Sequence, residues 1–175
     1  MKWMPYATAL LSVTPIIGHS AVYLTAEQAQ KLMFPSATMK KISVRLTDEQ
    51  VKSLKKSSGI FYAFKANQVY KSSDGGWLVI DQVLGKHEMI TYAVALTAKG
   101  AVKQVEILEY NESYGGQVRD ESWRQQFVGK TSSSPLALNK DIKNISGATL
   151  SSRHVTDGVK RILQFHDLVL KSLAS

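Results

Sequence analysis

The stretch that decides the fold joins a glycine-containing turn to a helix start: Ile145-Ser146-Gly147-Ala148-Thr149-Leu150-Ser151-Ser152. After it, apolar residues recur at alternating steps of four and three, which is the spacing of one helix face. This face consists of Val155, Val159, Ile162, His166, Val169 and Leu173, widened by Leu163 and Leu170. We predict that Ser151 or Ser152 caps the helix and that Asp157 lies near the positive end of its dipole. Thr149 is therefore expected just outside the helix N-terminus.

Such a helix start is suited to binding a phosphate. Backbone N–H groups converge there, and Gly147 has no Cβ that would keep a ligand away from the main chain. The hydroxyl of Thr149 would then lie within covalent reach of the phosphate. The alternative is that Ser146 to Thr149 form an ordinary turn and cap, because four small residues often match such a pattern by chance.

The segment also resembles the flavinylation motif of the FMN-binding domain family, which includes subunits of the sodium-pumping NADH:quinone reductase and of the Rnf complex. In that family the last Thr of an Asp-x-x-Ser/Thr-Gly-Ala-Thr pattern carries FMN through a phosphoester bond. The residues that match or continue the pattern are Ser146, Gly147, Ala148, Thr149 and Leu150. Lys143 stands where the family's Asp is usual, so it either slows recognition by the flavin transferase or helps to neutralise the FMN phosphate.

A second resemblance covers Tyr92 to Gly116, which is similar to the family's paired strands and the Glu-Thr-Pro-Gly-Leu-Gly loop after them. Glu112, Gly115 and Gly116 match this loop, whereas Ser113 and Tyr114 differ from it. The resemblance implies that Glu112 orients the loop or a ribityl hydroxyl, and that Tyr114 or Trp123 offers a flat apolar surface to the flavin ring. The alternatives are a plain surface carboxylate for Glu112 and ordinary packing for the two aromatic residues.

The rest of the pattern predicts an α+β fold. Two capping boxes, Thr25 with Gln28 and Thr47 with Gln50, start short helices that end near Met33 and Lys56. Alternation and turn residues predict an antiparallel sheet built from hairpins, with a short N-terminal helical part and a long C-terminal helix after the flavin-attachment turn. Strands are expected at residues 42–46, 61–70, 77–84, 91–96 and 102–110, and a short helix at 120–127.

We divide the chain into a signal peptide (residues 1–20), an N-terminal part of unknown role (21–75) and an FMN-binding domain (76–175). Lys2 precedes an uncharged, largely apolar run, and the small residues at 18–21 suit cleavage, which predicts export to a periplasm. The alternative is a retained anchor, but Pro5 and Pro15 interrupt the run, which is also short for a membrane span.

Composition narrows the function further. The 175 residues include no cysteine, so disulfides, iron–sulfur ligation and thioether haem attachment are excluded. The net charge of +8 would suit nucleic acid, an anionic membrane surface or an acidic partner, and export argues against nucleic acid. His87, His154 and His166 do not have the spacing of a metal site, and His166 is expected in the core.

Together these observations predict an exported flavoprotein that carries electrons rather than a stand-alone enzyme. The expected cofactor is FMN, covalently attached at Thr149. The expected partners are the flavin transferase and a membrane-bound redox protein, and peripheral association with a membrane stays open. Two alternatives remain: an accessory or binding module of the same fold without covalent flavin, and a periplasmic flavin reductase.

Overall fold

The computed structural model describes residues 21–174, so the predicted signal peptide lies outside the described residues. Short 3-10 turns η1 (Gly116–Arg119), η2 (Gln125–Phe127) and η3 (Leu170–Ala174) join or end the main elements. The helices are α1 (Ala26–Met33), α2 (Asp48–Ser58), α3 (Glu121–Arg124) and α4 (Thr149–Leu168). The strands are β1 (Ala21–Val22), β2 (Met39–Ile42), β3 (Val69–Ser72), β4 (Trp77–Leu84), β5 (Met89–Leu96) and β6 (Val102–Tyr110).

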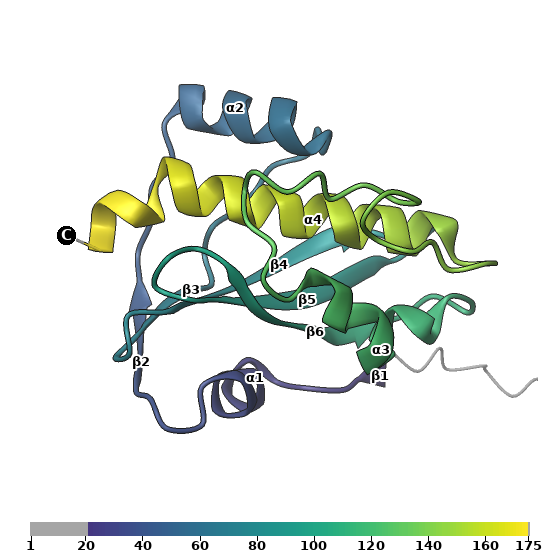
Figure 1. Ribbon diagram of the computed structural model, residues 1–175, viewed down its shortest axis with the longest axis horizontal. Coiled ribbons are helices and arrows are strands. Elements are labelled where there is room, and N and C mark those ends of the chain that lie inside the picture. Colours follow the sequence, from purple (N-terminus) through teal and green to yellow (C-terminus); the bar gives the residue numbers. More distant parts are fainter. Residues whose placement is uncertain (1–20, 175) are drawn as a thin grey trace, which may run out of the picture.

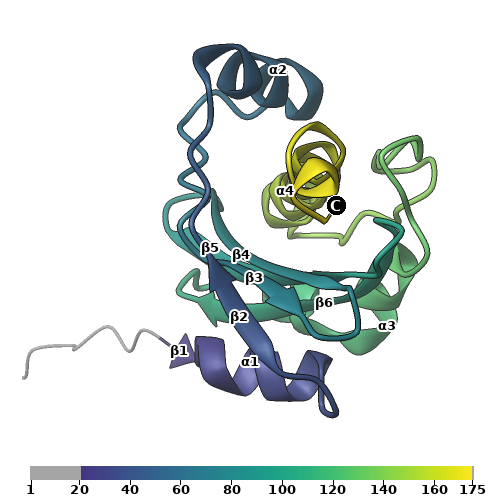
Figure 2. The ribbon, with the colours of Figure 1, turned by 90° about the vertical axis from the view of Figure 1, so that its left-hand side faces the viewer.

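The strands form one antiparallel sheet of six strands in the order β1-β6-β5-β4-β3-β2. Helix α4 lies across one face of this sheet and α1 covers the other, while α2 packs on the side of α4 that is turned away from the sheet (Figures 1 and 2). The predicted α+β class, with a hairpin-built sheet and a long C-terminal helix, is confirmed.

The central strands are apolar on both faces because both faces are covered. Val79 of β4 and Val94 of β5 belong to the large core beneath α4. Their neighbours Leu78 and Ala93 point the other way, into a smaller core against α1. An unbroken run of buried residues from Trp77 to Ile80 therefore reflects two cores rather than one.

Local signals at the first two helices are confirmed. Thr25 and Gln28 form a reciprocal capping box at α1, and Thr47 and Gln50 form another at α2. Helix α2 ends at Gly59, which adopts the left-handed conformation that favours glycine. The short helix predicted at 120–127 is present as α3 followed by η2, although Asp120 at its N-cap makes no side-chain capping bond.

Two predicted strands are wrong in position. The first is β2, which lies at Met39–Ile42; residues 43–46 alternate in burial but pair with no described strand. The second was expected at 61–70, yet only Val69–Ser72 enters the sheet. The residues before it cross over α4, where the ring of Phe64 meets Phe165 edge-on at 4.8 Å. Core packing rather than strand pairing thus explains the burial of Phe64 and Ala66, whereas Phe61 is exposed.

Helix α4 also corrects three expectations. It begins at Thr149, so Ser151 and Ser152 are buried residues of its first turn and neither is the cap. Asp157 lies beyond the first turn, where the effect of the helix dipole has largely faded. The chain leaves α-helical geometry at Val169 and tightens into η3, which turns Leu173 out of the apolar stripe and leaves it 50% exposed.

The predicted boundary between residues 75 and 76 falls in the turn that joins β3 to β4, and strands from both sides belong to the one sheet. The serine-rich stretch at residues 132–135 is held against α4. Gln164 Nε2 donates to the carbonyl oxygen of Ser132 at 3.1 Å, and the Ser132 hydroxyl donates to Asp167. Among residues 21–174, no helix is both long enough and apolar enough to cross a membrane.

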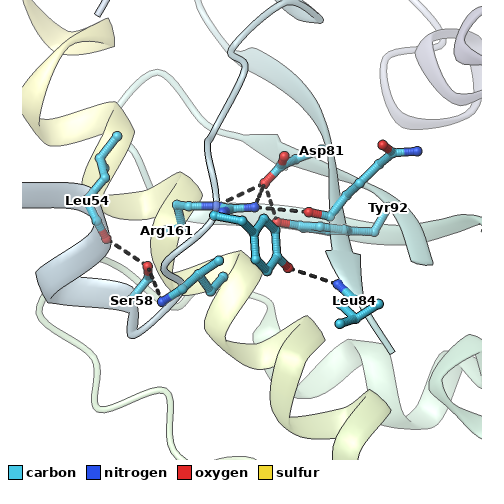
Figure 3. Close-up of polar contacts among 9 residues, drawn as sticks. Leu54, Ser58, Asp81, Leu84, Tyr92 and Arg161 are labelled. Carbon is cyan, nitrogen blue, oxygen red and sulfur yellow. Dashed lines mark hydrogen bonds and ion pairs between the residues drawn. The ribbon is translucent and has the colours of Figure 1, made fainter. Parts of the chain in front are cut away.

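A buried ion pair fixes the middle of α4 over the sheet (Figure 3). Arg161 is 1% exposed, and its Nε and Nη2 atoms donate to Asp81 Oδ2 at 3.1 and 2.5 Å. The Nη2 atom also donates to the carbonyl oxygen of Gln82, and the hydroxyl of Tyr92 donates to the same Asp81 oxygen at 2.8 Å. Burial, together with the charge of Asp81, raises the pKa of Tyr92 well above its usual value. Helix and sheet are therefore joined by charge as well as by apolar contact.

We predict that Arg161→Ala destabilises the protein by about 3–5 kcal/mol, because it leaves the Asp81 carboxylate buried without its cation. Arg153→Ala is the matched control, since Arg153 is an exposed arginine of the same helix, and its effect should stay within about 0.5 kcal/mol. Urea unfolding of both variants measures the difference. Equal midpoints in the two variants would show that the pair does not hold the helix.

Candidate functional site

A cleft of about 490 Å³ lies where three segments meet at the N-terminal end of α4. Figure 1 shows that α4 begins at the same end of the molecule at which β6 ends. One wall is the turn and helix start, the second is the loop after β6, and the third is the turn between β4 and β5. The lining residues are Lys86, His87, Glu112, Ser113, Tyr114, Gly147, Ala148, Thr149, Leu150 and Ser151.

The helix start presents unpaired backbone donors to this cleft. Residues 145–148 form a turn in which the Ala148 N–H donates to the carbonyl oxygen of Ile145 at 3.0 Å. Within residues 21–174 no side chain caps α4, and the first backbone N–H with an intrahelical partner is that of Ser152, which donates to Ala148. The preceding N–H groups are thus left for a ligand, and an anion is the species that they and the helix dipole favour.

Gly147 is needed for its backbone conformation. Its φ of +79° is the left-handed value that the third residue of such a turn requires. A Cβ built on Gly147 would meet no described atom within 4 Å, so space does not demand a glycine there. The reason that the structure shows for a glycine at this position is therefore the positive φ.

Thr149 is exposed and is the first residue of the helix rather than a residue outside it. Its Oγ1 atom accepts a hydrogen bond from Asn144 Nδ2 at 3.1 Å, and Asn144 Oδ1 accepts one from the buried hydroxyl of Ser152 at 2.9 Å. The sequence did not predict the contact between Asn144 and Thr149. Residues five positions apart do not lie on the same face in the period of a helix or of a strand.

The loop after β6 is tied to the helix by Tyr110. The hydroxyl of Tyr110 donates to the carbonyl oxygen of Tyr114 at 2.5 Å and lies 3.0 Å from the hydroxyl of Ser151. Gly115 packs at this junction, and a Cβ on it would approach the Tyr110 hydroxyl to 2.5 Å and the Ala148 side chain to 2.8 Å. Gly115 therefore does not line the cleft; its absence of a side chain lets two of the walls meet.

Glu112 joins the same loop to the turn between β4 and β5. Its Oε1 atom accepts the backbone N–H groups of His87 and Glu88, the latter at 3.0 Å. Burial by itself raises the pKa of Glu112, but the backbone donors of residues 86–88 outweigh it and hold the pKa below its usual value. The carboxylate is thus ionised and occupied in fixing the cleft, which matches the expected role of orienting the loop.

The two candidate aromatic residues lie in different environments. Tyr114 is 85% exposed and lines the cleft, so it is available as a flat apolar surface. Trp123 is 6% exposed, packs edge-on against Phe127 at 5.1 Å and donates from Nε1 to the carbonyl oxygen of Lys143 at 2.8 Å. Trp123 thus supports the segment that leads into the turn and does not line the cleft.

The β4–β5 turn contributes Lys86 and His87 to the lining of the cleft. Neither residue was predicted from the sequence to contact a cofactor. The exposed residues Lys143 and Ser146 are not among the lining residues. Asp141, two residues before Lys143, is engaged elsewhere: its carboxylate accepts the N–H of Ala137 at 2.9 Å and pairs with Lys130 at 3.0 Å.

The other described histidines, His154 and His166, have structural roles. His166 is buried as predicted, and its ring fills the space beside Gly100, where a Cβ would lie 2.4 Å from it. Burial lowers the pKa of His166. His154 contacts the carbonyl oxygen of Leu84 through Nδ1 at 2.5 Å. Among residues 21–174, no group of three or more histidine, aspartate or glutamate side chains is placed to hold a metal ion.

A comparison with known protein families gives a match that covers the whole cleft. No curated protein matches the chain. The sequence model described as the FMN-binding domain matches residues 85–164, a range that begins at the β4–β5 turn and includes all three walls of the cleft. Residues 85–164 therefore match the FMN-binding domain family.

Proposed function

We propose that this protein is an exported electron carrier whose FMN is joined to Thr149 through a phosphoester bond. The observation that carries the proposal is the exposed hydroxyl of Thr149 at the first position of a helix that no described side chain caps. This hydroxyl lies in a cleft within the matched FMN-binding domain. The flavin supplies the redox chemistry, and the polypeptide supplies attachment and surroundings.

The residues of the cleft fit the two ends of a phosphorylated flavin. The free N–H groups of the α4 start and the ammonium of Lys86 suit the phosphate, because both favour negative charge. The exposed ring of Tyr114 and the side chain of Leu150 suit the apolar faces of the isoalloxazine ring. A negative end and a flat apolar end are thus both provided for in one cleft.

The same arrangement supports covalent attachment. The Thr149 oxygen gains a bond to phosphorus and loses its hydrogen, and the donor, a phosphoanhydride of FMN, loses its other phosphate. The product is therefore heavier than the polypeptide by the mass of FMN less one water. Such a bond is useful for an exported carrier, because a cofactor lost outside the cytoplasm is not readily replaced.

The compartment and partners belong to the same proposal. The composition of residues 1–20 supports export. A carrier of this kind needs a flavin transferase for its maturation, a membrane-bound reductase as donor and a periplasmic or membrane acceptor. The positive net charge would assist encounters with acidic partners or with an anionic membrane surface.

We predict that Thr149→Val abolishes covalent flavin, because it removes the acceptor oxygen while keeping the size and branching of the side chain. The exposed position should limit the loss of stability to about 0.5 kcal/mol. Intact mass and flavin absorbance after denaturation measure attachment in protein secreted by a host that makes the transferase. Ser146→Ala is the matched control: it removes a hydroxyl of the same motif and should leave attachment complete.

The same measurement separates the alternatives. Wild-type protein without the added mass would reject the covalent carrier and favour an accessory module. Full attachment in Thr149→Val would reject Thr149 as the acceptor. Substrate turnover by the isolated, flavinylated protein would instead favour a flavin reductase.

We predict that Lys86→Gln slows flavin incorporation severalfold at low salt and that the defect shrinks near physiological salt, where charges are screened beyond about 8 Å. The reason is the loss of a cation that lines the same cleft as the start of α4. Lys143→Gln is the control, because it removes the same charge from an exposed position that is not among the lining residues. A larger defect in Lys143→Gln than in Lys86→Gln would return the phosphate-neutralising role to Lys143.

A further inference from the structure

Asn144 makes a bridge between Thr149 and the buried part of α4. Its Nδ2 atom donates to Thr149 Oγ1 at 3.1 Å, while its Oδ1 atom accepts from Ser152 Oγ at 2.9 Å. Ser152 is fully buried and its hydroxyl also lies 3.0 Å from the carbonyl oxygen of Ala148. One end of the amide is therefore anchored in the core, and the other end holds the exposed hydroxyl.

This contact restricts a side chain that would otherwise rotate. A threonine in a helix divides between two rotamers, because its hydroxyl can bond to a carbonyl oxygen of the preceding turn. Thr149 is the first residue of α4, and the one hydrogen bond described for its hydroxyl within residues 21–174 is the one from Asn144. The bond with Asn144 thus selects the direction in which Thr149 Oγ1 points.

The direction of this hydrogen bond, from the Asn144 amide to the Thr149 hydroxyl, also suits a hydroxyl that acts as a nucleophile. An amide N–H can only donate, so it occupies one lone pair of Thr149 Oγ1 and leaves the other lone pair and the hydroxyl hydrogen unused. Attack on phosphorus needs that second lone pair, and a base needs access to that hydrogen. A carbonyl oxygen in place of the amide would have tied up the hydrogen instead.

We propose that Asn144 is the positioning residue that holds the Thr149 hydroxyl in the orientation required for transfer of FMN to it. The inference rests on the attachment at Thr149 proposed above. In the transfer, a bond forms between Thr149 Oγ1 and the phosphorus of an FMN phosphoanhydride. The anhydride bond breaks, its other phosphate leaves, and the hydroxyl proton passes to a base of the transferase. Asn144 takes no part in these bond changes and acts through the orientation of Thr149.

Asn144→Ala tests this role in the full chain with the purified transferase and flavin adenine dinucleotide as the phosphoanhydride. Initial rates of covalent flavin fluorescence at increasing protein concentration give kcat and KM separately. Misorientation of the attacking atom should lower kcat by about 10- to 100-fold. The KM for the protein should stay within about twofold, because the surface that the transferase meets is little changed.

Two further variants separate positioning from folding and from recognition. Asn144→Asp keeps the size of the side chain and can still accept from Ser152, but its carboxylate cannot donate to Thr149 Oγ1 and would instead tie up the hydroxyl hydrogen, so its kcat should be lowered as in Asn144→Ala. Lys143→Ala changes the exposed neighbour that touches neither hydroxyl, and its kcat should equal that of the wild type. Melting temperatures of the unmodified proteins should fall by no more than about 5 °C.

The outcomes are distinct. An unchanged kcat in Asn144→Ala, or a raised KM with unchanged kcat, would overturn the positioning role while leaving attachment at Thr149 intact. An equal loss of kcat in Lys143→Ala would overturn it too, because the segment as a whole would then be responsible. If Asn144→Ala fails to fold, an unchanged kcat in folded Asn144→Asp overturns the role. Wild-type protein that takes no covalent flavin would overturn this inference together with the proposed function.

Discussion

The rest of the structure depends on helix α4, which has to satisfy two opposing requirements. Helix α4 must bury a long face against the sheet, and its first turn must stay open to solvent. The ion pair of Arg161 with Asp81 holds the middle of the helix, and a Cβ on Gly158 would lie 2.4 Å from the Tyr92 hydroxyl, so the helix and sheet approach closely there. Because the middle and the first turn are both held, Thr149 is fixed relative to the strands without being covered by them.

The cleft is likewise held together by polar contacts among its own walls. Glu112 joins the loop after β6 to the β4–β5 turn, and Tyr110 joins that loop to Ser151 of the helix. Neither contact uses the N–H groups at the start of α4, which leaves them for an anion. A site whose walls are already tied loses little conformational freedom when a ligand enters, so more of the interaction energy appears as affinity.

Sequence patterns correctly predicted the structural features that depend on residues close together in the chain. Both capping boxes, the β3–β4 and β5–β6 hairpins and the apolar stripe of α4 follow from spacing and turn residues. Patterns failed where a distant element decided the outcome: Phe64 alternates like a strand residue but packs on Phe165. At the site, the resemblance indicated the turn and the loop, whereas Lys86 and Tyr110 emerged only when chain segments far apart were brought together. The contact of Asn144 with Thr149 depends on the conformation of the turn between them.

Lys143 illustrates why position in a pattern and position in space differ. The pattern compares residues by their offset from Thr149 and therefore draws attention to Lys143. In space, the backbone of Lys143 is held by Trp123 and Gln126 on the outer side of the turn, and its neighbour Asn144 reaches the hydroxyl. The positive φ at Gly147 reverses the chain between them, so the side chain that arrives at Thr149 is set by turn geometry. The hydroxyl of Thr149 is thus held by Asn144 and not by Lys143, the residue to which the pattern draws attention.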